Sequence, residues 1–330
     1  MRISRDRVTS LVVIAPSVLA VAIFVYGLIF WTGYISTVKW DTLRPDYTGV
    51  GIANYQSIFG QNRFLMDIRN TVVFTLFFIT ASLTIGLLLA NLVDRQIRGE
   101  GLFRNLFVFP MAISFIGTGV VWKWILSPGQ AAFGTSPATP QGINQLFGLD
   151  PATNRWFTDP HIDYISPGSP AYGILHDIGL GFITSPNIGI PVALLSLVLA
   201  AVWQMSGFVM VLYLAGLRAI PEELKEAARV DGCTEWRIFR HIVFPLLLPV
   251  TLSAMIILGH ISLKIYDLAV AMTGSGPGFA TDTPALFMWQ TAFRDDHFGR
   301  GAAAAIVMLA LVAVVVVPYL VWTRRQEVES

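Results

Sequence analysis

Residues 221–232 read Pro-Glu-Glu-Leu-Lys-Glu-Ala-Ala-Arg-Val-Asp-Gly, a polar island between strongly apolar stretches. Pro221 suits the first position of a helix, and the two glutamates after it favour the positive N-terminal end. Gly232 can take the left-handed conformation that ends such a helix. One face of this helix carries the apolar side chains Leu224, Ala227, Ala228 and Val230. Thr234 is placed to cap a second short helix. The apolar stripe of that second helix is Trp236, Phe239 and Ile242. The sequence therefore predicts two short helices joined at a glycine.

The composition is that of a helical membrane protein. Hydrophobic residues make up 54% of the 330 residues and charged residues 13%, against about 25% charged in a soluble domain. The mean hydropathy is +0.63. A net charge of +1 without any basic run gives no indication of nucleic-acid binding. The single cysteine, Cys233, excludes a disulfide bond within the chain.

Apolar windows predict six membrane-spanning helices, since a spanning helix needs about 20 mostly apolar residues. The predicted spans are 11–35, 70–92, 105–126, 189–217, 249–272 and 301–322. The first is too long for a cleavable signal, and no small-residue cleavage site follows it. We therefore expect one all-α membrane domain over residues 1–330, with an external loop at 127–188.

The lysine and arginine residues predict the orientation. If both termini lie inside, the inner segments carry 13 basic residues and the outer segments carry 7. The positive-inside rule then places both termini and the loop 218–248 in the cytoplasm.

The order Glu-Ala-Ala, two residues, Asp-Gly, and then Phe, Ile and Pro resembles the signature loop of the membrane subunits of binding-protein-dependent ABC importers. The matching positions are Glu226, Ala227, Ala228, Asp231, Gly232, Phe239, Ile242 and Pro245. The family resemblance implies that residues 218–248 form a coupling loop that docks into a cleft on a cytoplasmic ATPase subunit. Glu222 lies in the first turn of the same docking helix. The chain departs from the family pattern at Cys233 and Phe244, where alanine and leucine are usual.

Further stretches resemble the carbohydrate-uptake branch of this family, which contains the maltose, glycerol-phosphate and glucose-type importers. They lie at 51–55, 109–114 and 273–277. An insertion within 128–142 departs from the shortest family pattern. The resemblance thus implies a carbohydrate as the substrate.

The resemblance also implies a complex in a bacterial or archaeal plasma membrane, surrounded by lipid. Its other members would be a second permease subunit, usually a different chain, two copies of a cytoplasmic ATPase subunit, and an external solute-binding protein. The ATPase would use ATP and Mg²⁺. This chain has no glycine-rich phosphate loop, so we expect it to carry no cofactor and to be no enzyme. Its five histidines have no metal-ligand spacing, and we expect neither a metal site nor a catalytic residue.

Polar groups in the predicted fourth and fifth spans are candidates for a sugar path, because polar side chains inside a membrane are costly and often functional. The candidates are Trp203, Gln204, Ser206, His260, Lys264 and Asp267. Gln204 and His260 have the alternative role of interhelical hydrogen bonding. Lys264 and Asp267, three residues apart, have the alternative role of a structural ion pair. Small residues four apart on the second span form a predicted helix–helix seam: Ser82, Gly86 and Ala90.

Other functional classes fit the sequence less well. A secondary transporter driven by an ion gradient is expected to show inverted repeats and broken helices, and neither is evident in the sequence. An intramembrane enzyme is expected to show a convergent nucleophile or metal-ligand set, and none is evident. An ABC importer for a solute other than a sugar is the remaining alternative.

Overall fold

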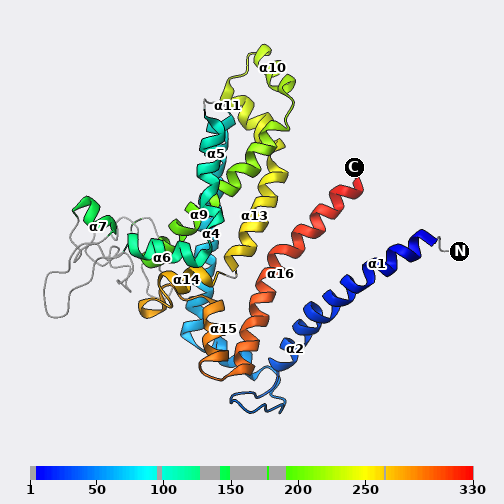
Figure 1. The fold of residues 1–330 in the computed structure, drawn as a ribbon, viewed down its shortest axis with the longest axis vertical. Helices are drawn as coiled ribbons and strands as arrows, with labels where there is room; N and C mark the ends of the chain where they lie inside the picture. Colours follow the sequence, from blue (N-terminus) through cyan, green and yellow to red (C-terminus); the bar gives the residue numbers. More distant parts are fainter. Residues whose placement is uncertain are drawn as a thin grey trace. The chain divides into compact units, whose positions relative to one another are not determined.

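The computed structural model describes residues 5–94, 99–126, 142–148, 177, 191–263 and 265–329. Within these ranges the chain is helical, apart from turns and one isolated β-bridge between Val38 and Gly49 (Figure 1). The all-α class is thereby confirmed. The predicted external loop 127–188 lies outside the described residues, except for α7 (Gly142–Phe147), Gly148 and Asp177.

The chain divides into two compact units, Met1–Phe64 with Phe287–Ala310, and Leu65–Leu286 with Leu311–Ser330. Two long helices, α4 (Asn62–Asp94) and α16 (Phe298–Glu329), have residues in both units. The expectation of a single membrane domain stays a prediction.

Three of the described helical stretches are long and apolar enough to cross a membrane: Val13–Ile35, Asn62–Asp94 and Ala193–Arg218. The first comprises most of α1 (Arg5–Val21), a π-helical stretch (Ala22–Gly27) and α2 (Leu28–Ile35). The second is α4, and the third lies within α9 (Val192–Arg218). Two bent helix pairs would bring the number to five, and α16 contributes a shorter apolar stretch, Phe298–Val314. The count of six spans stays a prediction.

The predicted span 105–126 is not one straight helix. α5 (Glu100–Val108) continues into a 3-10 turn, Phe109–Ala112, and α6 (Phe115–Ile125) leaves at an angle of 99°. Pro110 has no backbone N–H to donate. Ser114 has extended backbone, and its hydroxyl accepts a hydrogen bond from the Gly117 N–H at 3.1 Å, so a new helix begins there. Hydropathy does not register this break because the residues around it are mostly apolar.

The predicted span 249–272 is also broken. α13 (Leu248–Leu263) ends before α14 (Asp267–Met272) begins, and the acidic side chain of Asp267 lies at the positive end of α14. Asp267 therefore opens a separate helix, and its expected pairing with Lys264 stays a prediction. Lys264, its expected partner, lies outside the described residues.

In the first unit, α3 (Ala53–Phe59) is tied to the turn after α2. The buried Asn54 side chain donates from Nδ2 to the carbonyl oxygens of Ser36 and Val38, each at 2.9 Å. The Tyr55 hydroxyl lies 2.7 Å from the Ser36 hydroxyl. These bonds fasten α3 to the turn that follows α2.

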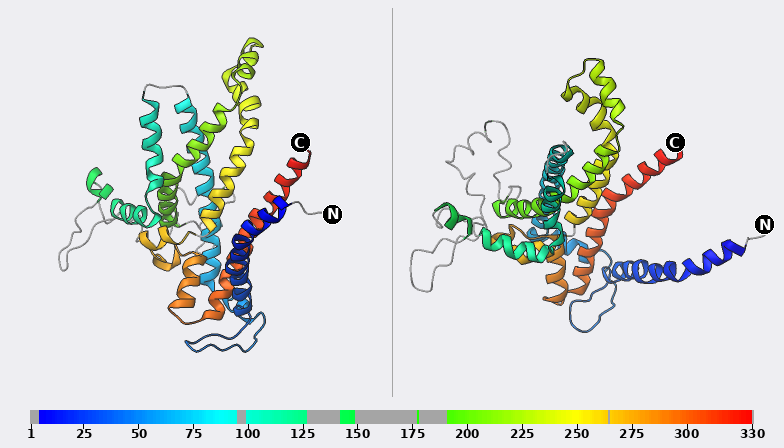
Figure 2. Two further views of the ribbon diagram at one scale, coloured as in Figure 1. Left: turned by 45° about the vertical axis from the view of Figure 1, so that its right-hand side comes forward. Right: turned by 45° about the horizontal axis from the view of Figure 1, so that its top comes forward.

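In the second unit, α9 forms the core and packs closely on α4 and α5. A Cβ at Gly86 of α4 would lie 2.5 Å from Val209 Cγ1, and a Cβ at Gly207 would lie 1.8 Å from the Phe107 carbonyl oxygen. Ser82 and Ala90, on the same face of α4, are fully buried. The predicted small-residue seam is therefore a packing face. Figure 2 shows α4, α9 and α13 side by side.

Candidate functional site

Residues 218–248 fold into two short helices joined at a glycine. α10 (Glu222–Val230) is followed by α11 (Glu235–Ile238), a π-helical stretch (Phe239–Val243) and α12 (Phe244–Leu246), which leads into α13. Figure 1 shows α10 and α11 projecting beyond the ends of α9 and α13. The helix–glycine–helix form is as predicted, except that Pro221 is the N-cap residue rather than the first residue of α10.

A specific turn ends α10 at Gly232. Gly232 has a φ of +79°. Its N–H donates to the Arg229 carbonyl oxygen, and the N–H of Cys233 donates to the Ala228 carbonyl oxygen, both at 3.0 Å. This pair of bonds is the Schellman motif, which requires a left-handed residue at the position of Gly232. The direction of the chain into α11 therefore depends on this glycine.

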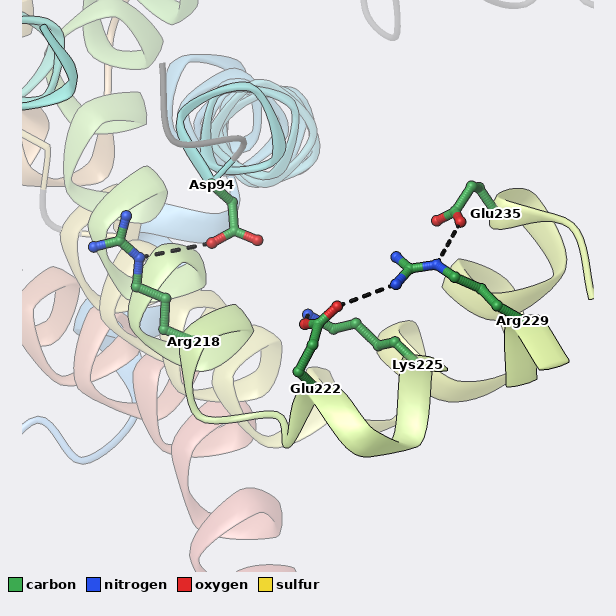
Figure 3. Close-up of polar contacts among 6 residues, drawn as sticks. All are labelled: Asp94, Arg218, Glu222, Lys225, Arg229 and Glu235. Carbon is green, nitrogen blue, oxygen red and sulfur yellow. Dashed lines mark hydrogen bonds and ion pairs between the residues drawn. The ribbon is translucent and has the colours of Figure 1, made fainter. Parts of the chain in front are cut away.

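Ion pairs hold α10 and α11 together. Glu222 accepts hydrogen bonds from Lys225 at 2.9 Å and from Arg229 at 3.2 Å. Arg229 also donates from Nε to Glu235 at 2.8 Å, which joins the start of α11 to the end of α10 (Figure 3). The hydrogen bond from Lys225, followed by that from Arg229, lowers the pKa of Glu222 below its ordinary value. The hydrogen bonds to Glu235 and Glu222 raise the pKa of Arg229.

The apolar side chains of this segment are only partly buried. On α10, Ala228 is 8% exposed, whereas Val230 is 87% exposed. On α11 and beyond, Trp236 is 68% exposed and stacks on the half-buried Phe239, with ring centroids 5.9 Å apart. The residue buried in its place is Ile238. Ala228 and Ile238 are thus the buried apolar side chains of α10 and α11.

The remaining signature residues lie on the surface. The exposed ones are Glu222, Glu226, Ala227, Asp231, Gly232 and Pro245, and Ile242 is half-buried. Glu226 forms no ion pair or hydrogen bond with any residue that the structure describes. Thr234 occupies the predicted N-cap position of α11, but its side chain makes no capping bond. The segment thus presents exposed carboxylates beside exposed apolar side chains.

Sequence reasoning missed Arg229 and Arg218, the two arginines that organise this region. Arg229 stands seven residues after Glu222 and six before Glu235 across the turn at Gly232, and neither pair has the i,i+3 or i,i+4 spacing that predicts an ion pair. Arg218 pairs with Glu100, which is 118 residues away in the sequence. No local pattern indicates that contact.

Gln204 of α9 is buried at the break between α5 and α6. Its Nε2 donates to the Ile113 carbonyl oxygen at 2.7 Å, a group that the break leaves without a helical partner. Its Oε1 is buried and has no hydrogen-bond partner among the described residues. Gln204 therefore has the interhelical role that was its alternative interpretation, with one acceptor oxygen left over.

The other candidates for the path are dispersed. Trp203 is partly exposed and packs edge-on against Trp122, with centroids 5.9 Å apart, and Ser206 is buried. His260 on α13 and Asp267 on α14 are exposed, and neither forms a hydrogen bond or ion pair with a described residue. The described residues include no group of three or more side chains placed to hold a metal ion.

The chain is similar to membrane components of transport systems. The family model described as "Binding-protein-dependent transport system inner membrane component" matches residues 178–327. A probable ABC transporter permease protein of Pyrococcus horikoshii is 34% identical over 330 residues, which cover 99% of this chain and 99% of that protein. The xylose/arabinose import permease protein XacH of Haloferax volcanii is 30% identical over 92% of this chain and 84% of its own length. A chain in the crystal structure of a bacterial ABC transporter involved in the import of the acidic polysaccharide alginate has a TM-score of 0.71 and 18% identity. That match covers 97% of this chain and 96% of the other, and it shows a shared fold.

Proposed function

From the premise that the chain belongs to the family of binding-protein-dependent transport system inner membrane components, we propose that it is the transmembrane subunit of an ATP-driven importer for a carbohydrate. The observation that carries the proposal is the segment 218–248, in which two helices are locked at Gly232 between membrane-length α9 and apolar α13. Its Schellman turn and the Arg229–Glu235 ion pair fix the direction of α11 relative to α10. Its exposed side chains offer a surface to a partner.

This segment couples the chain to the ATPase. The exposed carboxylate of Glu226 is available to a basic group, and the exposed apolar side chains of Val230 and Trp236 can fill an apolar cleft. Closure of two ATPase subunits around ATP and Mg²⁺ then displaces the segment as one body. Because α9 and α13 continue from its two ends, the displacement passes into the membrane and changes which side is open.

The complete importer contains more than this chain. Its other parts are a second permease subunit, two copies of the cytoplasmic ATPase and an external solute-binding protein. The excess of lysine and arginine on 1–10, 94–104, 218–248 and 324–330 supports cytoplasmic placement of both termini and of the coupling segment.

The substrate class follows from relatives and from groups on α9. XacH is named as a xylose/arabinose import permease, and the matched segments resemble the carbohydrate branch. We place the path beside Trp203, Gln204 and Ser206, with His260 and Asp267 exposed on the next helices and Lys264 close to them in sequence. One N–H of the Gln204 amide is donated to the Ile113 carbonyl, and its buried Oε1 is an acceptor that a sugar hydroxyl can meet.

Reconstitution tests the proposal. The chain is co-expressed with a candidate ATPase, second permease subunit and solute-binding protein, and the complex is purified and placed in vesicles. Uptake of labelled xylose, arabinose, a maltooligosaccharide and glycine betaine is then measured. The expected result is uptake of one of the sugars that vanadate abolishes and that a proton ionophore leaves unchanged.

The controls separate the alternatives. Uptake that stops with the ionophore and continues with vanadate would assign an ion-gradient-driven transporter. Vanadate-sensitive uptake of glycine betaine alone would assign an importer for a non-sugar solute. If no ATPase co-purifies, the coupling role of residues 218–248 is refuted.

A further inference from the structure

Arg218 joins the base of the coupling segment to the last residue of α4 and the first residue of α5. It is the last residue of α9, three residues before Pro221. Its Nη2 lies 2.6 Å from Glu100 Oε1, and its Nε lies 3.6 Å from Asp94 Oδ1. Asp94 is the last residue of α4 and Glu100 the first residue of α5. One guanidinium group thus bridges the facing ends of three helices.

The helix ends favour this arrangement. Arg218 lies at the negative C-terminal end of α9, and Glu100 lies at the positive N-terminal end of α5. Asp94 would by itself be unfavourable at the C-terminal end of α4, and the arginine offsets its charge. The charges at these three helix ends therefore favour the placement of Arg218 beside Asp94 and Glu100.

The Arg218 cluster is separate from the ion pairs within the coupling segment. Figure 3 shows Asp94 and Arg218 pointing toward one another, and Glu222, Lys225, Arg229 and Glu235 forming a second group. An open cleft of about 840 Å³ adjoins both groups. Its charged lining residues are Asp94, Glu100, Arg218, Glu222, Glu223 and Lys225. The second group lies within the segment, whereas the first joins its base to α4 and α5.

α4 is suited to carry a displacement over a long distance. It has 33 residues, so it is about 50 Å long at 1.5 Å per residue. Its inner face packs on α9 through Gly86, where no larger side chain fits. Near its other end, the buried Asn70 donates from Nδ2 to the carbonyl oxygens of Phe279 and Asp282, at 2.9 and 3.0 Å. A shift of α4 along its axis would therefore reach the turn before α15 (Pro284–Phe293).

We propose that Arg218 is a positioning residue for coupling. It clamps α4 and α5 to the base of the coupling segment, so that the two helices move together with the segment when the ATPase closes. This proposal rests on the proposed function and deepens it. The clamp adds an ionic connection to α4 and α5 to the covalent connections of the segment through α9 and α13.

The partial exposure of the cluster makes the proposal testable. The side chains of Arg218, Asp94 and Glu100 are 43%, 30% and 25% exposed. Exposed ion pairs contribute little to overall stability, so loss of this one should leave folding and ATPase binding intact. A change in the movement of α4 can then be attributed to the clamp.

The experiment measures whether α4 follows the coupling segment. In the complex with its ATPase, Cys233 is replaced by alanine and spin labels are attached to cysteines introduced at Leu92 of α4 and Thr234 beside α11. The distance between the labels is measured without nucleotide and after trapping with ATP, Mg²⁺ and vanadate. The expected result is one distance in both states for the chain with Arg218, and two different distances for Arg218→Gln.

Three further variants complete the test. Arg218→Lys and the charge exchange Arg218→Glu with Glu100→Arg should restore a single distance. Arg104→Gln removes a nearby charge on α5 that forms no ion pair with a described residue, and it should behave like the unsubstituted chain.

The outcomes are distinguishable from failure of the proposed function. If the trapped complex forms but the distance already changes with Arg218 present, the clamp is refuted and the importer role stands. An unchanged distance between the two labels in Arg218→Gln would also refute the clamp. If the ATPase does not bind the unsubstituted chain, the proposed function itself fails.

Discussion

Substitution of Gly232 should uncouple the importer in proportion to the strain that the new residue introduces. We expect Gly232→Asn to retain most of the activity, Gly232→Ala to lose a substantial part and Gly232→Val to lose nearly all. The order follows from the φ of +79° at this position. Asparagine tolerates left-handed backbone better than other non-glycine residues, and a β-branched residue tolerates it least.

The structure separates backbone strain from packing at this site. A Cβ at Gly232 would meet no atom within 4 Å, so substitution creates no clash. The cost is that of left-handed backbone, roughly 1–2 kcal/mol for an ordinary residue. That amount shifts an equilibrium about 5- to 30-fold. The two hydrogen bonds of the turn would be lost first, which would change the direction of α11 relative to α10.

Vanadate-sensitive uptake and co-purification with the ATPase are measured for the three variants. Gly51→Ala is the matched control, because Gly51 has a φ of +59° and equally open surroundings but lies outside the coupling segment. It should carry a similar strain and leave coupling intact. Normal uptake by Gly232→Val, or equal losses for Gly51→Ala and Gly232→Ala, would refute the reasoning.

Three other predictions follow from packing, hydrogen bonding and charge. Gly207→Ala should lower the unfolding temperature in detergent, because its Cβ would lie 1.8 Å from a carbonyl oxygen of α5 and overpacking costs about 1–3 kcal/mol. Gly101→Ala, in open space, should not lower it, and equal effects would contradict the close approach of α9 and α5. Gln204→Ala should weaken apparent sugar affinity about ten- to a hundredfold, equivalent to ~1–3 kcal/mol, in the uptake assay. It should also lower the unfolding temperature, and a change in that temperature alone would leave Gln204 with only its structural role. Acid should loosen the coupling segment, because the bonds from Lys225 and then Arg229 lower the pKa of Glu222. Their contribution is present above the ordinary carboxyl pKa and is lost as the pH falls through the lower folded value. A spin label on α11 should therefore gain mobility in acid, and Glu222→Gln should show the high mobility at every pH.

Local features of the chain were predictable from residue order. The class of protein follows from hydropathy, since a bilayer accepts long apolar helices and little else. The turn at Gly232 follows from a polar helix that meets a glycine, and Ser82, Gly86 and Ala90 show a seam because their spacing repeats along one helix face. Each of these depends on neighbours within a few residues.

Contacts between distant residues decided the rest. Gln204 was expected to line a sugar path or to bond between helices, and only the bend after Pro110 brings the Ile113 carbonyl, 91 residues away in sequence, to its amide. Arg218 pairs with Glu100 because the C-terminal end of α9 lies beside the N-terminal end of α5. Sequence by itself determined the long apolar segments and the turn at Gly232, because those depend on local chemistry, but it did not show the breaks before α6 and α14. The tertiary structure alone decided which polar group satisfies which, because an unpaired group near a helix end takes the nearest partner in space.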